Sequence, residues 1–107
     1  MKIDIRAIGF SLTDSLERQV VAGLERVLRR GDPTLRRIQV RLRDVNGPRG
    51  GADKRCSLRV DYAGREVLAV SRTHADLYAA ISMATEAVSR NRDDRSRRVR
   101  DARRRLS

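Results

Sequence analysis

The chain has 107 residues and a formal net charge of +11, with 25 Lys and Arg against 14 Asp and Glu. This length suits one domain with a modest core, and the charge attracts polyanions, either nucleic acid or an anionic membrane surface. Three aromatic residues are too few for recognition by base stacking, and a single cysteine excludes an intrachain disulfide or a cysteine-based metal cluster. With no signal peptide or membrane span in the sequence, a cytoplasmic protein without a cofactor is expected.

The first half of the chain predicts a strand, a helix and a second strand. Residues 2–7 alternate between aliphatic and charged, which is the period of a half-buried strand. Thr13 offers a helix N-cap, apolar residues recur at helical spacing over 16–28, and the segment 31–33 (Gly-Asp-Pro) ends the helix. In residues 37–43 aliphatic side chains alternate with Arg and Gln, which predicts a strand with one apolar and one cationic face.

The second half predicts two more strands. A glycine-rich loop at 46–54 leads to a strand over 56–62, and a tight turn at 63–65 leads to a strand over 67–71. With a β-α-β start and short hairpins after it, we expect an α+β fold of order β-α-β-β-β-α. Its sheet is four-stranded and mixed, with the two helices packed on one face.

A last helix begins after a capping-box pattern formed by Thr73 and Asp76. The Thr73 side chain would reach forward to the backbone N–H of Asp76, and the Asp76 side chain would reach back to that of Thr73. Its apolar stripe ends at Val88, after which arginines replace the aliphatic residues. A helix over 75–104 would be about 45 Å long, longer than a small domain is wide, so its end must protrude or fray. The predicted organisation is one α/β domain, residues 1–90, followed by a basic helical extension or tail, residues 91–107.

The C-terminal run carries most of the excess charge. Residues 89–107 hold nine Arg and three Asp, which is more than half of the net charge. Charge runs are usually solvated tails, but this one continues a capped helix and has Asp and Arg spaced for i,i+4 pairs. Only two of the basic residues are lysine, and guanidinium groups bind phosphate bidentately, although the same bias can reflect a GC-rich genome. Contact with RNA is the favoured reading.

The loop at 46–54 is the second candidate site. It places Arg49 and Lys54 among three glycines, whose backbone N–H groups can converge on an anion. It matches no nucleotide-binding fingerprint, and a flexible hairpin connection is the alternative. The only histidine, His74, has no nucleophile or orienting carboxylate in a suitable position, and no carboxylate pair lies in an apolar setting. Neither an enzyme nor a metal site is expected.

Two segments carry a resemblance to a known family. MKIDIRAIGFSLTDSLERQV at the start and ADLYAAISMATEAVSR in the last helix resemble the ribosome hibernation-promoting factors, which include the ribosome-associated translation inhibitor. The resemblance covers about residues 1–98. Three positions depart from the family pattern: Ala87 replaces a common lysine, Ser82 a common aspartate and Arg92 a common apolar residue.

The resemblance implies a fold like that of double-stranded RNA-binding domains, and binding to small-subunit rRNA between the head and body of the subunit. There the protein would block mRNA and tRNA sterically near the decoding centre in stationary phase or stress. It implies a short form, with any pairing of ribosomes left to a separate partner. No small-molecule substrate or membrane is expected. The predicted RNA-binding residues are Arg26, Arg29, Arg30, Arg49, Lys54, Arg72, Arg90, Arg92, Arg95, Arg97 and Arg98.

Two other functions remain open at this stage. A general double-stranded RNA-binding module would share the electrostatics but would not discriminate ribosomal subunits from any duplex. A non-ribosomal regulatory module that binds proteins would use the arginines to hold an acidic partner.

Overall fold

The structure is a computed structural model that describes residues 2–45, 53–64 and 66–106, with side chains as far as residue 91. Within these residues the chain forms six elements in the order β-α-β-β-β-α. They are β1 (Lys2–Ile8), α1 (Asp14–Arg29), β2 (Leu35–Asp44), β3 (Lys54–Tyr62), β4 (Val67–His74) and α2 (Leu77–Leu106). The predicted fold class is confirmed.

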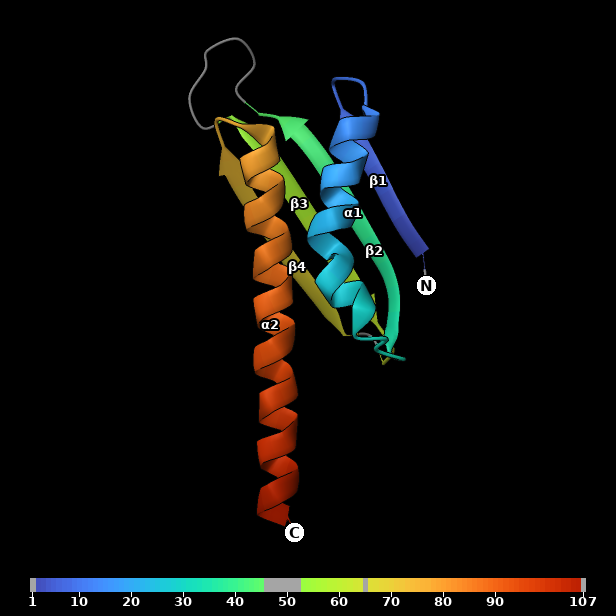
Figure 1. Ribbon diagram of the computed structural model, residues 1–107, viewed down its shortest axis with the longest axis vertical. Coiled ribbons are helices and arrows are strands. Elements are labelled where there is room, and N and C mark those ends of the chain that lie inside the picture. Colours follow the sequence, from blue (N-terminus) through green and yellow to red (C-terminus); the bar gives the residue numbers. More distant parts are fainter. Residues whose placement is uncertain (1, 46–52, 65, 107) are drawn as a thin grey trace.

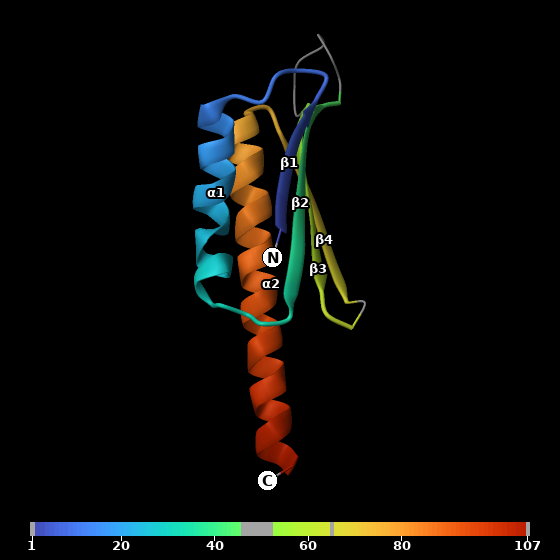
Figure 2. The same ribbon diagram turned by 90° about the vertical axis from the view of Figure 1, so that its right-hand side faces the viewer.

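The strands form one sheet in the order β1-β2-β3-β4. β1 and β2 are parallel and are joined through α1, whereas β2, β3 and β4 are antiparallel neighbours (Figure 1). Both helices lie on the same side of the sheet, and no described element covers its other side (Figure 2). The molecule therefore has a helix side and an open sheet face.

The core lies between the helices and the sheet. Each strand alternates, so one set of side chains points at the helices, and the apolar stripe of each helix points back at the sheet. Every buried aliphatic position on β2, β3 and the two helices belongs to one cluster. Its fully enclosed members include Val20, Leu24, Ile38, Leu42, Val60, Ile81 and Val88.

The start of α1 is as the sequence predicts. The Thr13 hydroxyl accepts a hydrogen bond from the backbone N–H of Leu16 at 3.2 Å, which satisfies one of the free N–H groups of the first turn. The end is as predicted too, because Gly31 takes a positive φ of 59° there. The Asp32 carboxylate then accepts from the Thr34 N–H at 2.9 Å and turns the chain towards β2.

The predicted capping box at the start of α2 is wrong. Strand β4 continues to pair with β3 as far as His74, so Thr73 is in the sheet and its hydroxyl accepts a hydrogen bond from Arg55 instead. Asp76 is the cap, with a carboxylate that accepts from the Tyr78 N–H at 3.0 Å. The imidazole of His74 accepts from the Asp76 N–H at 2.9 Å, so this histidine organises the turn.

Helix α2 is much longer than its contact with the sheet. Among the side chains that the structure describes, up to residue 91, Val88 is the last buried aliphatic one on α2, yet the helix continues to Leu106 and extends beyond the sheet (Figure 1). The expected protrusion is confirmed, and the molecule measures 58 × 25 × 22 Å. In the part of the chain that the structure describes, no helix is both long and apolar enough to cross a bilayer.

Cys56 is fully buried on β3, and burial raises the pKa of its thiol to about 12. The thiolate is the reactive form, so the folded protein at pH 8 is expected to resist alkylation, whereas the urea-unfolded chain reacts at the rate of an ordinary cysteine. Labelling with iodoacetamide followed by mass spectrometry measures both. Rapid labelling of the folded protein would show that β3 is accessible, in contradiction to this packing.

Candidate RNA-binding surface

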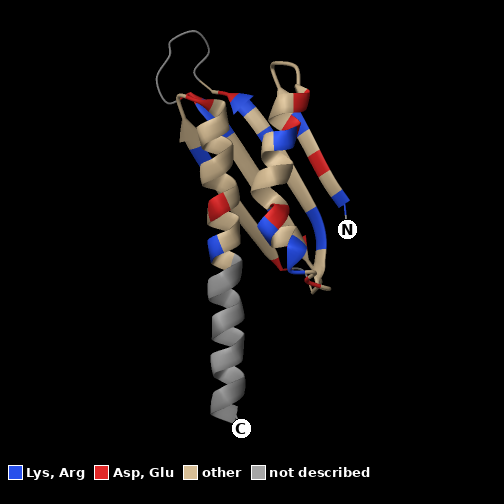
Figure 3. Ribbon diagram, viewed as in Figure 1, with Lys and Arg blue, Asp and Glu red and all other residues tan. Residues whose placement is uncertain are grey.

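A groove between the two helices brings together basic residues of α1 and α2. It has a volume of about 270 Å³ and is lined by small side chains and by Arg26, with Glu86 and Ser89 on the opposite wall. Arg30 reaches across and donates to the Ser89 carbonyl at 3.4 Å. Arg90 follows Ser89 directly, so basic residues of both helices lie near this end of the groove, and Figure 3 marks the basic positions of α1 and α2 in blue.

Arg29 of α1 and Arg90 of α2 each form an ion pair within their own helix. Arg29 contacts Glu25 at 3.2 Å and Arg90 contacts Glu86, each as an i,i+4 pair with both side chains more than half exposed. Exposed pairs of this kind contribute little to stability because water and salt screen them. Phosphate oxygens can therefore replace the glutamates at little cost, and both guanidinium groups are available for a polyanion.

Arg72 joins the same surface from the sheet. It lies on β4, on the helix side, and shares a shallow depression of about 180 Å³ with Met83, Glu86 and Arg90 of α2. Arg90 thus sits between Arg72 on one flank and the α1 arginines on the other. We call Arg26, Arg30, Arg72 and Arg90 the helix-side cluster.

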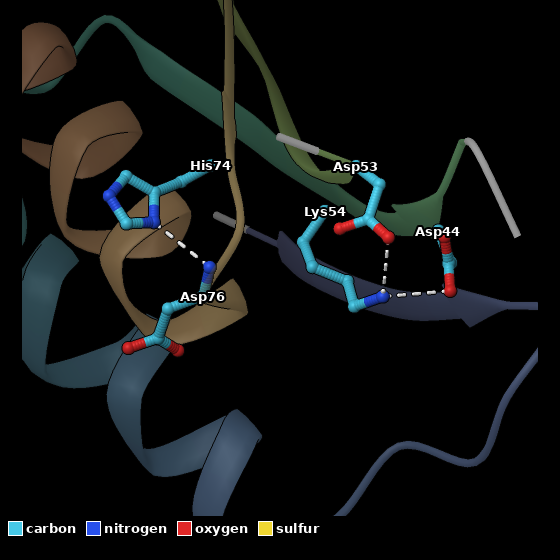
Figure 4. Close-up of polar contacts among 5 residues, drawn as sticks. All are labelled: Asp44, Asp53, Lys54, His74 and Asp76. Carbon is cyan, nitrogen blue, oxygen red and sulfur yellow. Dashed lines mark hydrogen bonds and ion pairs between the residues drawn. The ribbon is translucent and has the colours of Figure 1, made fainter. Parts of the chain in front are cut away.

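Lys54 lies apart from the helix-side cluster, at the start of β3. Its ammonium donates to Asp44 at 2.8 Å and to Asp53 at 3.2 Å (Figure 4). The hydrogen bond to Asp44 is the main reason that the pKa of Lys54 is raised, against a smaller opposing effect of burial. With two carboxylates beside it, Lys54 contributes less attraction for phosphate than its charge alone suggests. The sheet register that pairs positions 44 and 54 creates this arrangement.

The remaining predicted contacts cannot be placed as side chains. Arg49 lies outside the described residues. Arg92, Arg95, Arg97 and Arg98 lie on the part of α2 that extends beyond the sheet, where the structure describes the backbone alone. All of the predicted RNA contacts therefore stay predictions, and the structure brings four of them, Arg26, Arg30, Arg72 and Arg90, into one region.

The open sheet face is the basic surface that the sequence-based site omitted. Seven basic side chains point from it into solvent, against two acidic ones. The basic residues are Lys2, Arg6, Arg37, Arg41, Arg43, Arg55 and Arg59, and the acidic ones are Asp4 and Asp61. The signal was present in the sequence, because 37–43 and 55–59 place arginine at every second or fourth position, on the side opposite the aliphatic residues.

The acids of this face are already paired. Asp4 contacts Arg41 at 3.2 Å and Arg6 at 3.4 Å, and Asp61 contacts Arg59 at 3.0 Å. Partial burial works against ionisation of Asp4, but the two arginines hold the pKa of its carboxyl below the usual value. Arg37 and Arg43 form no ion pair with any residue that the structure describes.

A small α+β domain with basic surfaces on both sides belongs to the class of binding proteins. Among the described residues, no group of three or more His, Cys, Asp or Glu side chains is placed to hold a metal. The sequence matches the family described as Sigma 54 modulation protein / S30EA ribosomal protein over residues 3–100, and the chain belongs to this family. The family consists of ribosome-associated, non-catalytic inhibitors of translation, so the predicted family is confirmed and the chain is not an enzyme.

Solved structures agree with this assignment. The N-terminal domain of Thermus thermophilus Protein Y shares 29% sequence identity with the chain, with a TM-score of 0.65 over 84% of this chain and 90% of that one. A ribosomal subunit interface protein from Coxiella burnetii has the same fold at 14% identity, with a TM-score of 0.72 over 90% of this chain and 98% of that one. No curated protein matches the sequence at a significant level.

Proposed function

We propose that this protein binds rRNA of the small ribosomal subunit near the decoding centre and blocks mRNA and tRNA there. It would do so in the cytoplasm, in stationary phase or under stress. Family membership supports the ribosome as the target. The observation that carries the binding mode is the helix-side cluster, which two helices and a strand assemble at one end of a groove.

Inhibition in this proposal is steric and needs no chemistry. Arginines contact phosphates, which positions a protein on RNA without reading bases directly. Arg29 and Arg90 exchange their glutamate partners for phosphate oxygens, while the packed core keeps the helices in place. The basic end of α2, residues 91–107, lengthens the contact along the channel. The few aromatic residues are consistent with binding by charge and shape.

Cosedimentation with separated ribosomal subunits tests the target. The purified protein is mixed with small subunits, large subunits or whole ribosomes at near-physiological salt, with excess duplex RNA as competitor. Saturable migration with the small subunit that survives the competitor is the expected result. If any duplex RNA competitor removes the protein from the ribosomal particles, the protein is a general RNA-binding module. A protein that stays at the top of the gradient in every mixture would point to a non-ribosomal partner.

Removal of two arginines from the helix-side cluster tests the surface. The double variant Arg26→Gln/Arg90→Gln is expected to bind small subunits about 10- to 100-fold more weakly, because each lost charge-assisted hydrogen bond costs about 1.5 kcal/mol or less after solvent screening. Binding is measured by titration of a fluorescently labelled protein with small subunits.

A matched control removes the same charge elsewhere. Arg18 and Arg36 are exposed and belong to neither basic surface, so Arg18→Gln/Arg36→Gln lowers the net charge equally. We expect this control to bind within about threefold of the unmodified protein, since screening weakens distant charges. Equal weakening of both double variants would show that net charge, rather than the helix-side cluster, determines the affinity.

A further inference from the structure

We propose that the open sheet face is a second RNA-binding surface, which holds the phosphate backbone of a strand separate from the one bound by the helices. The proposal rests on the proposed function for the identity of the RNA, but not for the surface itself. The helices cover the opposite side of the sheet (Figure 2). A single short segment of RNA therefore cannot contact the open sheet face and the helix side at once. The protein would therefore bridge two RNA segments.

The shape of this face suits an extended polymer. A depression of about 350 Å³ runs across β2, β3 and β4, because the residues at its centre have short side chains. Ser57 and Ser71 form its floor, with their hydroxyl groups hydrogen-bonded to each other at 3.2 Å, so one of the two can donate to an anion. Arg41 and Arg59 line the same depression and flank the two hydroxyls.

The charge pattern indicates an occupant that is strongly anionic. Arg43 and Arg55 are direct cross-strand partners, so two like charges face each other in an antiparallel pair, an arrangement that destabilises a sheet. On the parallel side, Lys2 is opposite Arg37, whereas Arg6 and Arg41 are opposite each other but share Asp4 as an ion-pair partner. Residues that oppose folding in this way are expected where function requires them. Phosphates placed over these pairs would remove the repulsion.

RNA is favoured over an acidic protein segment for two reasons. The basic side chains cover three strands as a broad field, with neighbouring strands about 4.8 Å apart and alternate residues about 6.7 Å apart, which matches a regular polyanion rather than one short acidic motif. The basic residues of the open sheet face are also all arginines apart from Lys2, and guanidinium groups bind phosphate bidentately. An acidic protein remains an outcome of the test.

The first test is the double variant Arg43→Gln/Arg55→Gln, compared with the same control, Arg18→Gln/Arg36→Gln. We expect about tenfold weaker binding to small subunits together with a higher urea midpoint of unfolding, since the substitution removes a like-charge pair. If these arginines only stabilised the fold, their substitution would lower both the affinity for small subunits and the urea midpoint of unfolding. Binding equal to that of the control would overturn the proposal and leave the helix-side cluster, and with it the proposed function, intact.

The second test identifies the occupant. Ala69 is exposed on the open sheet face and Ala22 is exposed on α1, so Ala69→Cys and Ala22→Cys each provide one attachment site for a photo-crosslinker, while the buried Cys56 stays unlabelled. We expect crosslinks from position 69 to an rRNA segment different from the one reached from position 22. Crosslinks from position 69 to a ribosomal protein, or none, would overturn the proposal.

If the unmodified protein fails to bind ribosomes, the proposed function fails, but the surface can still be tested. The same variants are then titrated with polyuridylate as the probe. About tenfold weaker binding of Arg43→Gln/Arg55→Gln than of the control would support an RNA-binding sheet face outside the ribosome. Equal affinities would overturn it.

Discussion

Replacement of Gly23 by leucine is expected to lower the free energy of unfolding by about 3 kcal/mol or more, the upper range for overpacked sites. Gly23 lies on α1 where the two helices approach most tightly. A Cβ atom placed on it would be 2.8 Å from the Cβ and 2.9 Å from the Cγ2 of Thr85 on α2. Thr85 is 2% exposed, and its Cβ atom is fixed to the helix backbone, so no rotation of its side chain relieves the contact. The helices must therefore move apart.

Urea unfolding measures this effect, and Ala22→Leu is its control. Ala22 is the exposed neighbour of Gly23 on the same helix, and its substitution is expected to change stability by about 0.5 kcal/mol or less. Thr85→Ala removes the Oγ1 and Cγ2 atoms, which both lie close to the added side chain, and leaves only Cβ. Combining it with Gly23→Leu should recover part of the lost stability, with a coupling of about 1 kcal/mol. A Gly23→Leu protein as stable as the control would contradict the close helix packing.

Affinity for the small subunit is expected to fall about 10³- to 10⁴-fold between 50 and 200 mM salt. The reason is counterion release: each phosphate contact contributes a slope of about 0.9 in log K against log salt, and the basic surfaces here suit about five to eight contacts. The titration is repeated at several salt concentrations, and the slope gives the number of contacts.

The helix and sheet variants provide the internal check on this slope. Arg26→Gln/Arg90→Gln and Arg43→Gln/Arg55→Gln should each reduce it by about two, because each removes two phosphate contacts. Arg18→Gln/Arg36→Gln should leave it unchanged. A slope near zero for the unmodified protein would indicate that apolar or protein–protein contacts dominate binding.

Local pattern was enough to predict the fold. Alternation in residues 2–7 and 37–43, the helical spacing after Thr13 and the turn at Gly31 each have a physical cause that acts within a few residues. The β-α-β start and the short hairpins after it then predicted the order and pairing of the strands. The start of α2 shows the limit of local pattern, because Thr73 and Asp76 have the spacing of a capping box in the sequence. The length of the β3–β4 ladder, which no local pattern reveals, places Thr73 in the strand instead.

The site was less predictable because it depends on which elements meet. The sequence identified arginines but not which of them share a surface. Packing of α1 on α2 places Arg26 in the same groove as Glu86, the ion-pair partner of Arg90. Lys54 was expected to be available, and the register that pairs it with Asp44 is a property of the sheet. The cationic face of residues 37–43 was predicted from the sequence, but its arginines were not included among the RNA-binding residues. Its significance depends on β3 adding a second row of arginines beside it.

The protruding end of α2 has a consequence for the speed of encounter. From Val88 to Leu106 the helix extends about 27 Å at 1.5 Å per residue, whereas the field of a surface charge decays over about 8 Å at physiological salt. Charge on this segment is therefore felt by a distant polyanion well before the field of the globular part is. The negative end of the helix dipole also favours arginine there. For the RNA binding proposed above, we expect the extension to enlarge the capture radius of the protein and to raise the association rate constant, and the two basic surfaces of the domain to determine how long the complex lasts.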